Sequence, residues 1–129
     1  MMKEKKIAVL KVEPGKHPEK CILANDLDSL QKAVSIGADY QGLIEIIGWD
    51  GVCILCNEEG KIIGLDGNRR IGDDIIAGVF YITAEDQEGN LASLTDAQIE
   101  QYRKRFWTIE YYTQQELMDA LDAGFCFYV

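Results

Sequence analysis

Short apolar runs alternate with polar turns through the first two thirds of the chain, a pattern that predicts β-strands. Pro14 and Gly15 form a strong turn signal between the first two runs, and Asp50 with Gly51 has the composition of a tight hairpin turn. Gly78 lies inside a run that is apolar on both faces, as in a central strand, and it predicts a bulge or a close backbone approach. The predicted strands cover residues 7–12, 20–24, 43–47, 52–56, 60–63 and 75–82.

Helical spacing replaces this pattern after the second predicted strand. Asp26 has a side chain suited to capping a helix. Leu27, Leu30 and Val34 follow at spacings of three and four residues, which predicts that all three are buried on one face. Gly37 is expected to end this helix after two to three turns.

Two C-terminal helices are predicted from their first turns. Thr95 and Gln98 have the spacing of a capping box, and Thr113 and Glu116 repeat it. Gly124 is expected to end the second of these helices. The apolar tail, residues 125–129, is expected either to pack on the domain or to contact a partner. The predicted buried faces are Leu94, Ile99, Tyr102 and Phe106 in one helix and Tyr112, Leu117 and Leu121 in the other.

These elements predict one α+β domain over residues 1–129. It combines an antiparallel, mostly meandering sheet of five to six strands with one helix packed on it and two C-terminal helices. The chain of 129 residues is 47% hydrophobic and 27% charged, which is typical of a globular domain with its own core. No run approaches the roughly 18 to 20 apolar residues of a membrane span, and no secretory signal is recognised. We therefore expect a cytoplasmic protein without a membrane partner.

The chain is acidic, with a net charge of −9. Residues 1–24 carry six lysines against three glutamates, and the remaining residues carry −12. This charge disfavours direct binding to a nucleic-acid backbone. The acidic residues either maintain solubility or imitate DNA to occupy a nucleic-acid-binding protein, and only the second role predicts one continuous acidic face.

The cysteines do not predict a metal site or a disulfide. Cys53 and Cys56 have a C-x-x-C spacing, but residues three apart on a strand point to opposite faces. No second C-x-x-C is present, and the only histidine, His17, lies far away in the sequence. We expect no metal or cofactor, and small buried side chains in a reducing compartment for Cys21, Cys53, Cys56 and Cys126.

Two polar loops hold the candidate binding residues, which are Asn57, Glu58, Glu59, Lys61, Asn68 and Arg69. Solvated turns would account for most of them, with Gly60 at a positive φ angle. Adjacent glutamates on an extended chain point apart, so Glu58 and Glu59 are a poor catalytic pair. Arg69 is suited either to bidentate capture of a carboxylate or phosphate, or to an internal salt bridge.

Aromatic residues near the C-terminus form a second candidate surface, with Trp107, Tyr111 and Tyr112 as candidate interface residues. They follow the basic triplet at residues 103–105, and aromatic side chains beside arginines often anchor protein interfaces. The triplet also complements the dipole at the end of a predicted helix. Core packing of these aromatics and of Trp49 is the alternative to an exposed patch.

Two short motifs resemble a conserved family of unknown function. They are VEPGK at residues 12–16 and NEEGK at residues 57–61, the second followed by Gly64-Leu65 and Asn68-Arg69. The resemblance covers about residues 7–106, leaving a C-terminal helix and apolar tail at residues 107–129. Members of this family are encoded by Firmicutes, other bacteria, phages and mobile elements. The resemblance implies an accessory protein that acts by binding, and it supplies no catalytic residue, ligand or cofactor.

The sequence contains no phosphate loop and no nucleophile motif, so we expect a non-enzymatic protein-interaction or regulatory module, monomeric or weakly dimeric. The first alternative is a small anionic-ligand binder or weak enzyme that uses Arg69 beside Glu58 or Glu59. The second is a DNA-mimic inhibitor of a nucleic-acid-binding protein. A ligand site predicts a pocket where the loops at residues 57–61 and 68–70 converge, whereas an interface predicts a flat or convex apolar patch.

Overall fold

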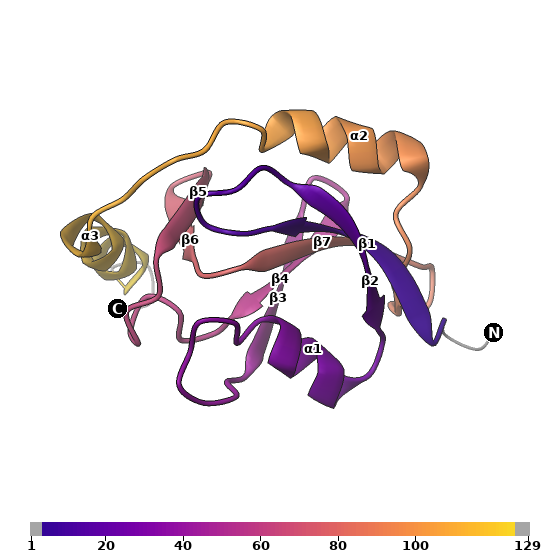
Figure 1. Cartoon of the computed structure of the whole chain (residues 1–129), viewed down its shortest axis with the longest axis horizontal. Helices are drawn as coiled ribbons and strands as arrows, with labels where there is room; N and C mark the ends of the chain where they lie inside the picture. Colours follow the sequence, from indigo (N-terminus) through magenta and orange to yellow (C-terminus); the bar gives the residue numbers. More distant parts are fainter. Residues whose placement is uncertain (1–3, 126–129) are drawn as a thin grey trace.

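A computed structural model describes residues 4–125 and contains a six-stranded antiparallel sheet flanked by two helices, with a small second sheet and a third helix at one end (Figure 1). This architecture confirms the predicted α+β class. The helices are α1 (Leu27–Ala33), α2 (Asp96–Arg105) and α3 (Gln114–Phe125). The strands are β1 (Lys6–Val12), β2 (Glu19–Ala24), β3 (Ile44–Trp49), β4 (Val52–Asn57), β5 (Gly67–Ile71), β6 (Asp74–Ala77), β7 (Phe80–Glu85) and β8 (Leu91–Ala92).

The main sheet has the order β2-β1-β7-β4-β3, and β8 pairs with β7. The hairpins β1–β2 and β3–β4 form from consecutive strands in unbroken antiparallel register. β7 lies between them, with Ile82 opposite Leu10 of β1 and Ile54 of β4. The strand that joins the two hairpins therefore comes from the second half of the domain.

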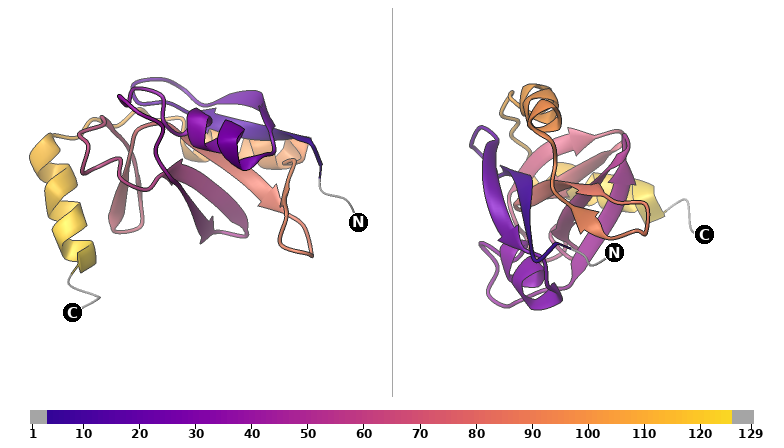
Figure 2. Two further views of the ribbon diagram at one scale, coloured as in Figure 1. Left: turned by 90° about the horizontal axis from the view of Figure 1, so that it is seen from below. Right: turned by 90° about the vertical axis from the view of Figure 1, so that its right-hand side faces the viewer.

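Alternating side chains place one apolar layer on each face of the main sheet. α2 covers one face and α1 the opposite face, as Figure 2 shows from the side. From α1, Leu30 packs on the sheet, and Val34 follows directly after the helix. The α2 side chains that pack against the other face are Ile99 and Tyr102, joined by Phe106 at the end of the helix.

The second sheet, β5 with β6, lies at the end of the molecule that carries α3 (Figure 2). Leu117 of α3 is completely buried against Leu65, Ile75 and Ala77. This small third cluster ties α3 to β6, so α3 packs on the second sheet rather than on the main one.

The predicted strand at residues 60–63 is wrong, because these residues form a turn in which the Ile63 N–H donates to the Glu59 carbonyl at 2.9 Å. The positive φ angle expected at Gly60 occurs instead at Gly64, with φ 82°. Gly60 is required for a different reason, since an added Cβ would lie 2.5 Å from the carbonyl oxygen of Ala77. The second predicted loop, at residues 68–70, lies within strand β5.

The predicted central strand at residues 75–82 is two strands in different sheets. β6 ends at Ala77 and β7 begins at Phe80, with Gly78 between them at φ +85°. Neither a bulge nor a close backbone approach accounts for Gly78, since the nearest atom to an added Cβ would be Leu65 Cδ1, a side-chain atom at 2.7 Å. This glycine lets the chain turn from the second sheet into the main sheet.

The predicted helix starts are confirmed. Asp26 caps α1, and its Oδ1 accepts from the Ser29 N–H at 2.8 Å. Thr95 and Gln98 form a complete capping box at α2. At α3, the Glu116 N–H donates to Thr113 Oγ1 at 3.1 Å and the Thr113 N–H donates to Glu116 Oε1 at 2.9 Å.

Two details of the helices are wrong. Leu27 is 63% exposed, because the short helix α1 packs on the sheet through Leu30 and Ala33, followed by Val34. α3 continues through Gly124 to Phe125, since a single glycine inside a helix costs only about 1 kcal/mol and does not end it. The predicted packing of the tail and of Cys126 falls almost entirely on residues outside those that the structure describes.

Candidate functional site

The predicted binding turn at residues 57–61 divides into buried and exposed side chains. Asn57 is buried at the end of β4, and its Oδ1 accepts from the Glu59 N–H at 2.9 Å. The Asn57 Nδ2 atom is also buried and has no hydrogen-bond partner within residues 4–125. Glu58 and Glu59 are exposed, whereas Lys61 forms an ion pair with Asp74 of β6. This turn is therefore attached to the second sheet.

Asn68 is completely buried in β5 rather than solvated in a turn. Its Nδ2 donates to the carbonyl of Val12 at 2.8 Å and to that of Gly78 at 2.9 Å. Its Oδ1 accepts from Arg69 Nη1 at 2.7 Å. One amide thus connects β5 to the end of β1 and to the link between β6 and β7.

Arg69 is the largest fully buried side chain among the described residues. Besides its bond to Asn68, Nε donates to the Phe106 carbonyl at 3.0 Å, and Nη2 donates to the Lys16 carbonyl at 2.8 Å. Burial lowers the pKa of the guanidinium, and the nearby Glu110 carboxylate opposes this shift. The guanidinium stays charged at neutral pH, because arginine starts from a very high value.

The internal salt bridge predicted for Arg69 is not formed, since no ion pair joins it to a carboxylate in residues 4–125. Its acceptors are two backbone carbonyls and one side-chain amide oxygen. Without the guanidinium the buried Phe106 carbonyl and Asn68 Oδ1 and the partly buried Lys16 carbonyl would each lose this donor. We call Asn68 and Arg69 the buried clamp.

The two carbonyls that Arg69 holds each precede an aromatic residue of one stacked pair. Lys16 precedes His17, and Phe106 precedes Trp107. The rings of His17 and Trp107 are stacked, with centroids 3.8 Å apart and planes 7° apart. The Trp107 carbonyl also accepts a hydrogen bond from His17 Nδ1 at 2.8 Å. The buried clamp therefore fixes the two backbone segments whose side chains form the stack.

The stack forms an exposed aromatic surface at the end of α2. Trp107 is 46% exposed, and Tyr111, further along the same connection to α3, is 80% exposed. The guanidinium carbon of Arg103 lies 5.8 Å from the Trp107 ring centroid. We call His17, Arg103 and Trp107 the Trp107 surface. Together with Tyr111, it is the part of the candidate interface that remains accessible.

Tyr112, the third predicted interface residue, is half-buried between β5 and α3. Its hydroxyl donates to the Glu110 carboxylate, and the guanidinium of Arg70 lies over its ring at 5.7 Å. Burial and the Glu110 carboxylate raise the pKa of the Tyr112 hydroxyl. These contacts attach the connection between α2 and α3 to the second sheet.

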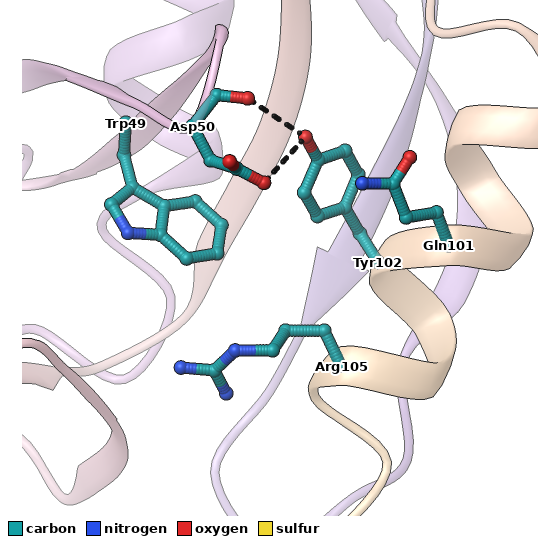
Figure 3. Close-up of a pocket in the computed structure, with 5 residues that line it drawn as sticks. All are labelled: Trp49, Asp50, Gln101, Tyr102 and Arg105. Atoms are coloured by element: carbon teal, nitrogen blue, oxygen red, sulfur yellow. Dashed lines mark hydrogen bonds between the residues drawn. The ribbon is translucent and has the colours of Figure 1, made fainter.

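A pocket lies between α2 and the β3–β4 turn (Figure 3). The Tyr102 hydroxyl donates to the backbone oxygen of Asp50 at 3.1 Å and to its Oδ2 at 3.2 Å. The turn at Asp50 and Gly51 has the predicted hairpin form, with positive φ angles of 50° and 80°. None of the predicted binding residues lines this pocket, whose walls are Trp49, Asp50, Gln101, Tyr102 and Arg105.

The sequence does not show which of these residues lie next to one another in the folded protein. Gln101 and Arg105 are four residues apart on a helix, and this spacing could have placed them on one wall. No comparable signal exists for His17 and Trp107, which are 90 residues apart. Their contact depends on how the β1–β2 loop meets the end of α2.

Cys53 and Cys56 point to opposite faces of the main sheet, as predicted, and pack in separate core clusters. Burial, reinforced by the Glu45 carboxylate, raises the pKa of the Cys56 thiol to about 12. Cys21 is only partly buried, unlike the prediction. Residues 4–125 contain no group of three His, Cys, Asp or Glu side chains arranged to hold a metal ion.

None of the helices within residues 4–125 combines the length and the apolar character that crossing a bilayer requires.

The chain belongs to the family described as Domain of unknown function (DUF3846), whose model matches residues 5–107. The match includes the buried clamp, His17 and Trp107, and it ends before α3 begins at Gln114. No curated protein and no solved structure matches this chain.

Proposed function

We propose that this protein is a non-enzymatic interaction or regulatory module that binds a protein partner through the Trp107 surface. The observation behind the proposal is that Trp107 is exposed although both its ring and the backbone next to it are held by other residues. Trp107 is 46% exposed, yet its ring is stacked on His17 and its backbone is held next to the buried Arg69. A large aromatic side chain that is already ordered loses little conformational entropy on binding.

The charges around this surface indicate the chemistry of the partner. The last turn of α2 carries Arg103, which lies over Trp107, and the adjacent Lys104, in a chain whose net charge is −9. A basic patch beside an exposed tryptophan is complementary to an acidic segment that also carries an apolar side chain. An extended polyanion such as nucleic acid is disfavoured, because it would meet the acidic remainder of the surface.

The anionic-ligand alternative has less support at its predicted position. It relies on Arg69, whose guanidinium is buried and donates to three internal acceptors. The carboxylates of Glu58 and Glu59 are exposed, but the Arg69 guanidinium is not accessible to a ligand that would bind beside them. A small-ligand function is better supported by the pocket at Arg105.

The DNA-mimic alternative needs carboxylates gathered on one face. Ion pairs instead join several of them to neighbouring lysines, including Glu13 with Lys11 and Asp28 with Lys32. Acidic side chains also occur on α1 and α2, which cover opposite faces of the main sheet. We therefore rank this function below protein binding. The family resemblance suggests an accessory role for a phage or mobile element, and we propose that this role is cytoplasmic.

The proposal is tested by affinity purification of the tagged protein from its host. Wild type, Trp107→Ala and a matched control, Tyr40→Ala, would be compared. Tyr40 is 55% exposed and lies in the loop between α1 and β3, so its removal deletes an exposed aromatic ring of similar size from another part of the molecule. A partner retained by wild type would then be purified, and its affinity for each variant measured by calorimetry.

We expect Trp107→Ala to weaken binding by about 2 kcal/mol or more, which is the level of an interface hot spot, while Tyr40→Ala changes affinity little. Thermal unfolding of both variants checks that the fold is retained. A partner that binds Trp107→Ala as tightly as wild type would contradict the proposed surface.

A further inference from the structure

The pocket between α2 and the β3–β4 turn is distinct from the Trp107 surface and has a volume of about 480 Å³. Pockets of this size hold small molecules when apolar walls are combined with a few polar groups. Here the polar groups are placed at two ends. Asp50 and Arg105 lie on opposite sides of the Trp49 ring, and Tyr102 and Gln101 form the facing wall on α2 (Figure 3).

Arg105 supplies a positively charged end with free donors. Its guanidinium carbon lies 5.7 Å from the Trp49 ring centroid and 4.8 Å from that of Phe106. Among the residues that the structure describes, none forms a hydrogen bond or an ion pair with Arg105. A guanidinium that is ordered by two rings and keeps its N–H groups free is suited to bidentate binding of a carboxylate.

Asp50 supplies an acceptor at the other end. Its position is fixed by the hairpin turn and by the Tyr102 hydroxyl, which donates to Oδ2 at 3.2 Å. The carboxylate is exposed. A carboxylate in this position can accept a hydrogen bond from the hydroxyl or amino group of a ligand. The same negative charge disfavours a doubly charged phosphate in this pocket.

The Trp49 ring lies between these two ends and provides a flat apolar wall. Trp49 is half-buried and packs against the core cluster beneath α2, at 5.6 Å from the Phe106 ring and 5.8 Å from the Tyr102 ring. Rings packed in this way are held in place, and a second flat ring can stack on the accessible part.

We propose that this pocket binds a planar aromatic carboxylic acid that carries a hydrogen-bond donor at the far end of its ring. The carboxylate binds Arg105, the ring lies against Trp49, and the donor binds Asp50. A free aromatic acid and the end of a peptide with the same groups share this chemistry. The probe is a free acid, because it isolates the pocket from the rest of a peptide.

The experiment titrates the protein with 4-hydroxybenzoate and follows amide NMR shifts of residues 49–51 and 101–105. We expect saturable binding with a dissociation constant of about 1 mM or tighter, as for other ligands of about ten heavy atoms. Benzoate, which lacks the donor, and phenol, which lacks the carboxylate, should each bind at least about threefold more weakly. A variant Asp50→Asn should reduce the preference for 4-hydroxybenzoate over benzoate.

Arg105→Gln should weaken binding by about tenfold, the loss expected for one charge-assisted bidentate contact. The matched control is Arg103→Gln. Arg103 is in the same turn of α2 as Arg105, but its guanidinium lies over Trp107 instead of Trp49. Equal loss in both variants would overturn the proposal, because it would indicate attraction by net charge alone. Absence of saturable shifts, or equally tight binding of inorganic phosphate, would overturn it as well.

Discussion

Arg69 and Arg105 contact the same residue, Phe106, from two environments. Arg69 donates from the interior to the Phe106 carbonyl at 3.0 Å and has two further acceptors. Arg105 lies 4.8 Å from the Phe106 ring centroid at the surface and donates to no group among the described residues. The buried guanidinium is saturated by the fold, whereas the exposed one remains available. Burial, rather than residue type, separates the structural arginine from the candidate binding arginine.

The largest effect is expected from removing the buried guanidinium. Arg69→Met removes the donor from the buried Phe106 carbonyl and Asn68 amide oxygen and from the partly buried Lys16 carbonyl. We expect the free energy of unfolding to fall by about 3 to 5 kcal/mol, measured by urea denaturation. Arg70→Met is the matched control, because Arg70 is adjacent and exposed and lies over Tyr112. Arg70→Met should lower the free energy of unfolding by about 1 kcal/mol or less. Equal losses in Arg69→Met and Arg70→Met would contradict the distinction between the buried and the exposed arginine.

A smaller effect on stability is expected from the ion pairs of Glu13, in the β1–β2 loop whose Lys16 carbonyl Arg69 holds. Hydrogen bonds from Lys11 and then Lys16 lower the pKa of Glu13 below its usual 4.5, at distances of 2.8 and 2.9 Å. The folded state therefore binds this proton less readily than the unfolded state. Its contribution is present above pH 4.5 and is lost as the pH falls through the lower folded-state value.

Glu13→Gln tests this contribution. Because Lys16 is 71% exposed, solvent screens the pair, and we expect a loss of about 0.5 to 1 kcal/mol at pH 7. Urea unfolding of wild type and variant at pH 7 and again near pH 3 gives the comparison. The difference between the two proteins should be smaller at the acidic pH. A difference of the same size at both pH values would show that packing, rather than charge, is responsible.

The smallest effect on stability is expected at Arg105. Arg105→Gln removes an exposed side chain without a polar partner among the described residues. The free energy of unfolding should therefore change by only about 0.5 kcal/mol or less. The same variant should weaken binding of the aromatic acid by about tenfold. A stability loss as large as that of Arg69→Met would show that Arg105 is structural too.

The sequence predicted what local spacing determines. The capping boxes at Thr95 and Thr113 and the hairpin turn at Asp50 each depend on residues within one turn, and all three are present. The fold class followed from the same local patterns.

The prediction failed where long-range contacts override local composition. Residues 68–70 are predicted to be a polar loop because Asn68, Arg69 and Arg70 are hydrophilic. They lie in a strand in which Asn68 and Arg69 are buried, because carbonyls from β1, the β1–β2 loop and the end of α2 supply the acceptors. No local sequence pattern predicts hydrogen-bond acceptors that are this distant in the sequence. The candidate binding arginine changed for the same reason, from Arg69 to Arg105, whereas Trp107 was already a candidate interface residue in the sequence.

The central claim is that the buried clamp holds the exposed His17–Trp107 stack in place. The most direct test is the nuclear Overhauser effect between the ring protons of His17 and Trp107 in wild type, Arg69→Lys and Arg70→Lys. Lysine keeps the charge, but a single ammonium cannot reproduce the three directed bonds of the guanidinium. The account predicts a clear effect in wild type and Arg70→Lys and a lost or strongly reduced one in folded Arg69→Lys. Full intensity in Arg69→Lys, or none in wild type, would contradict it.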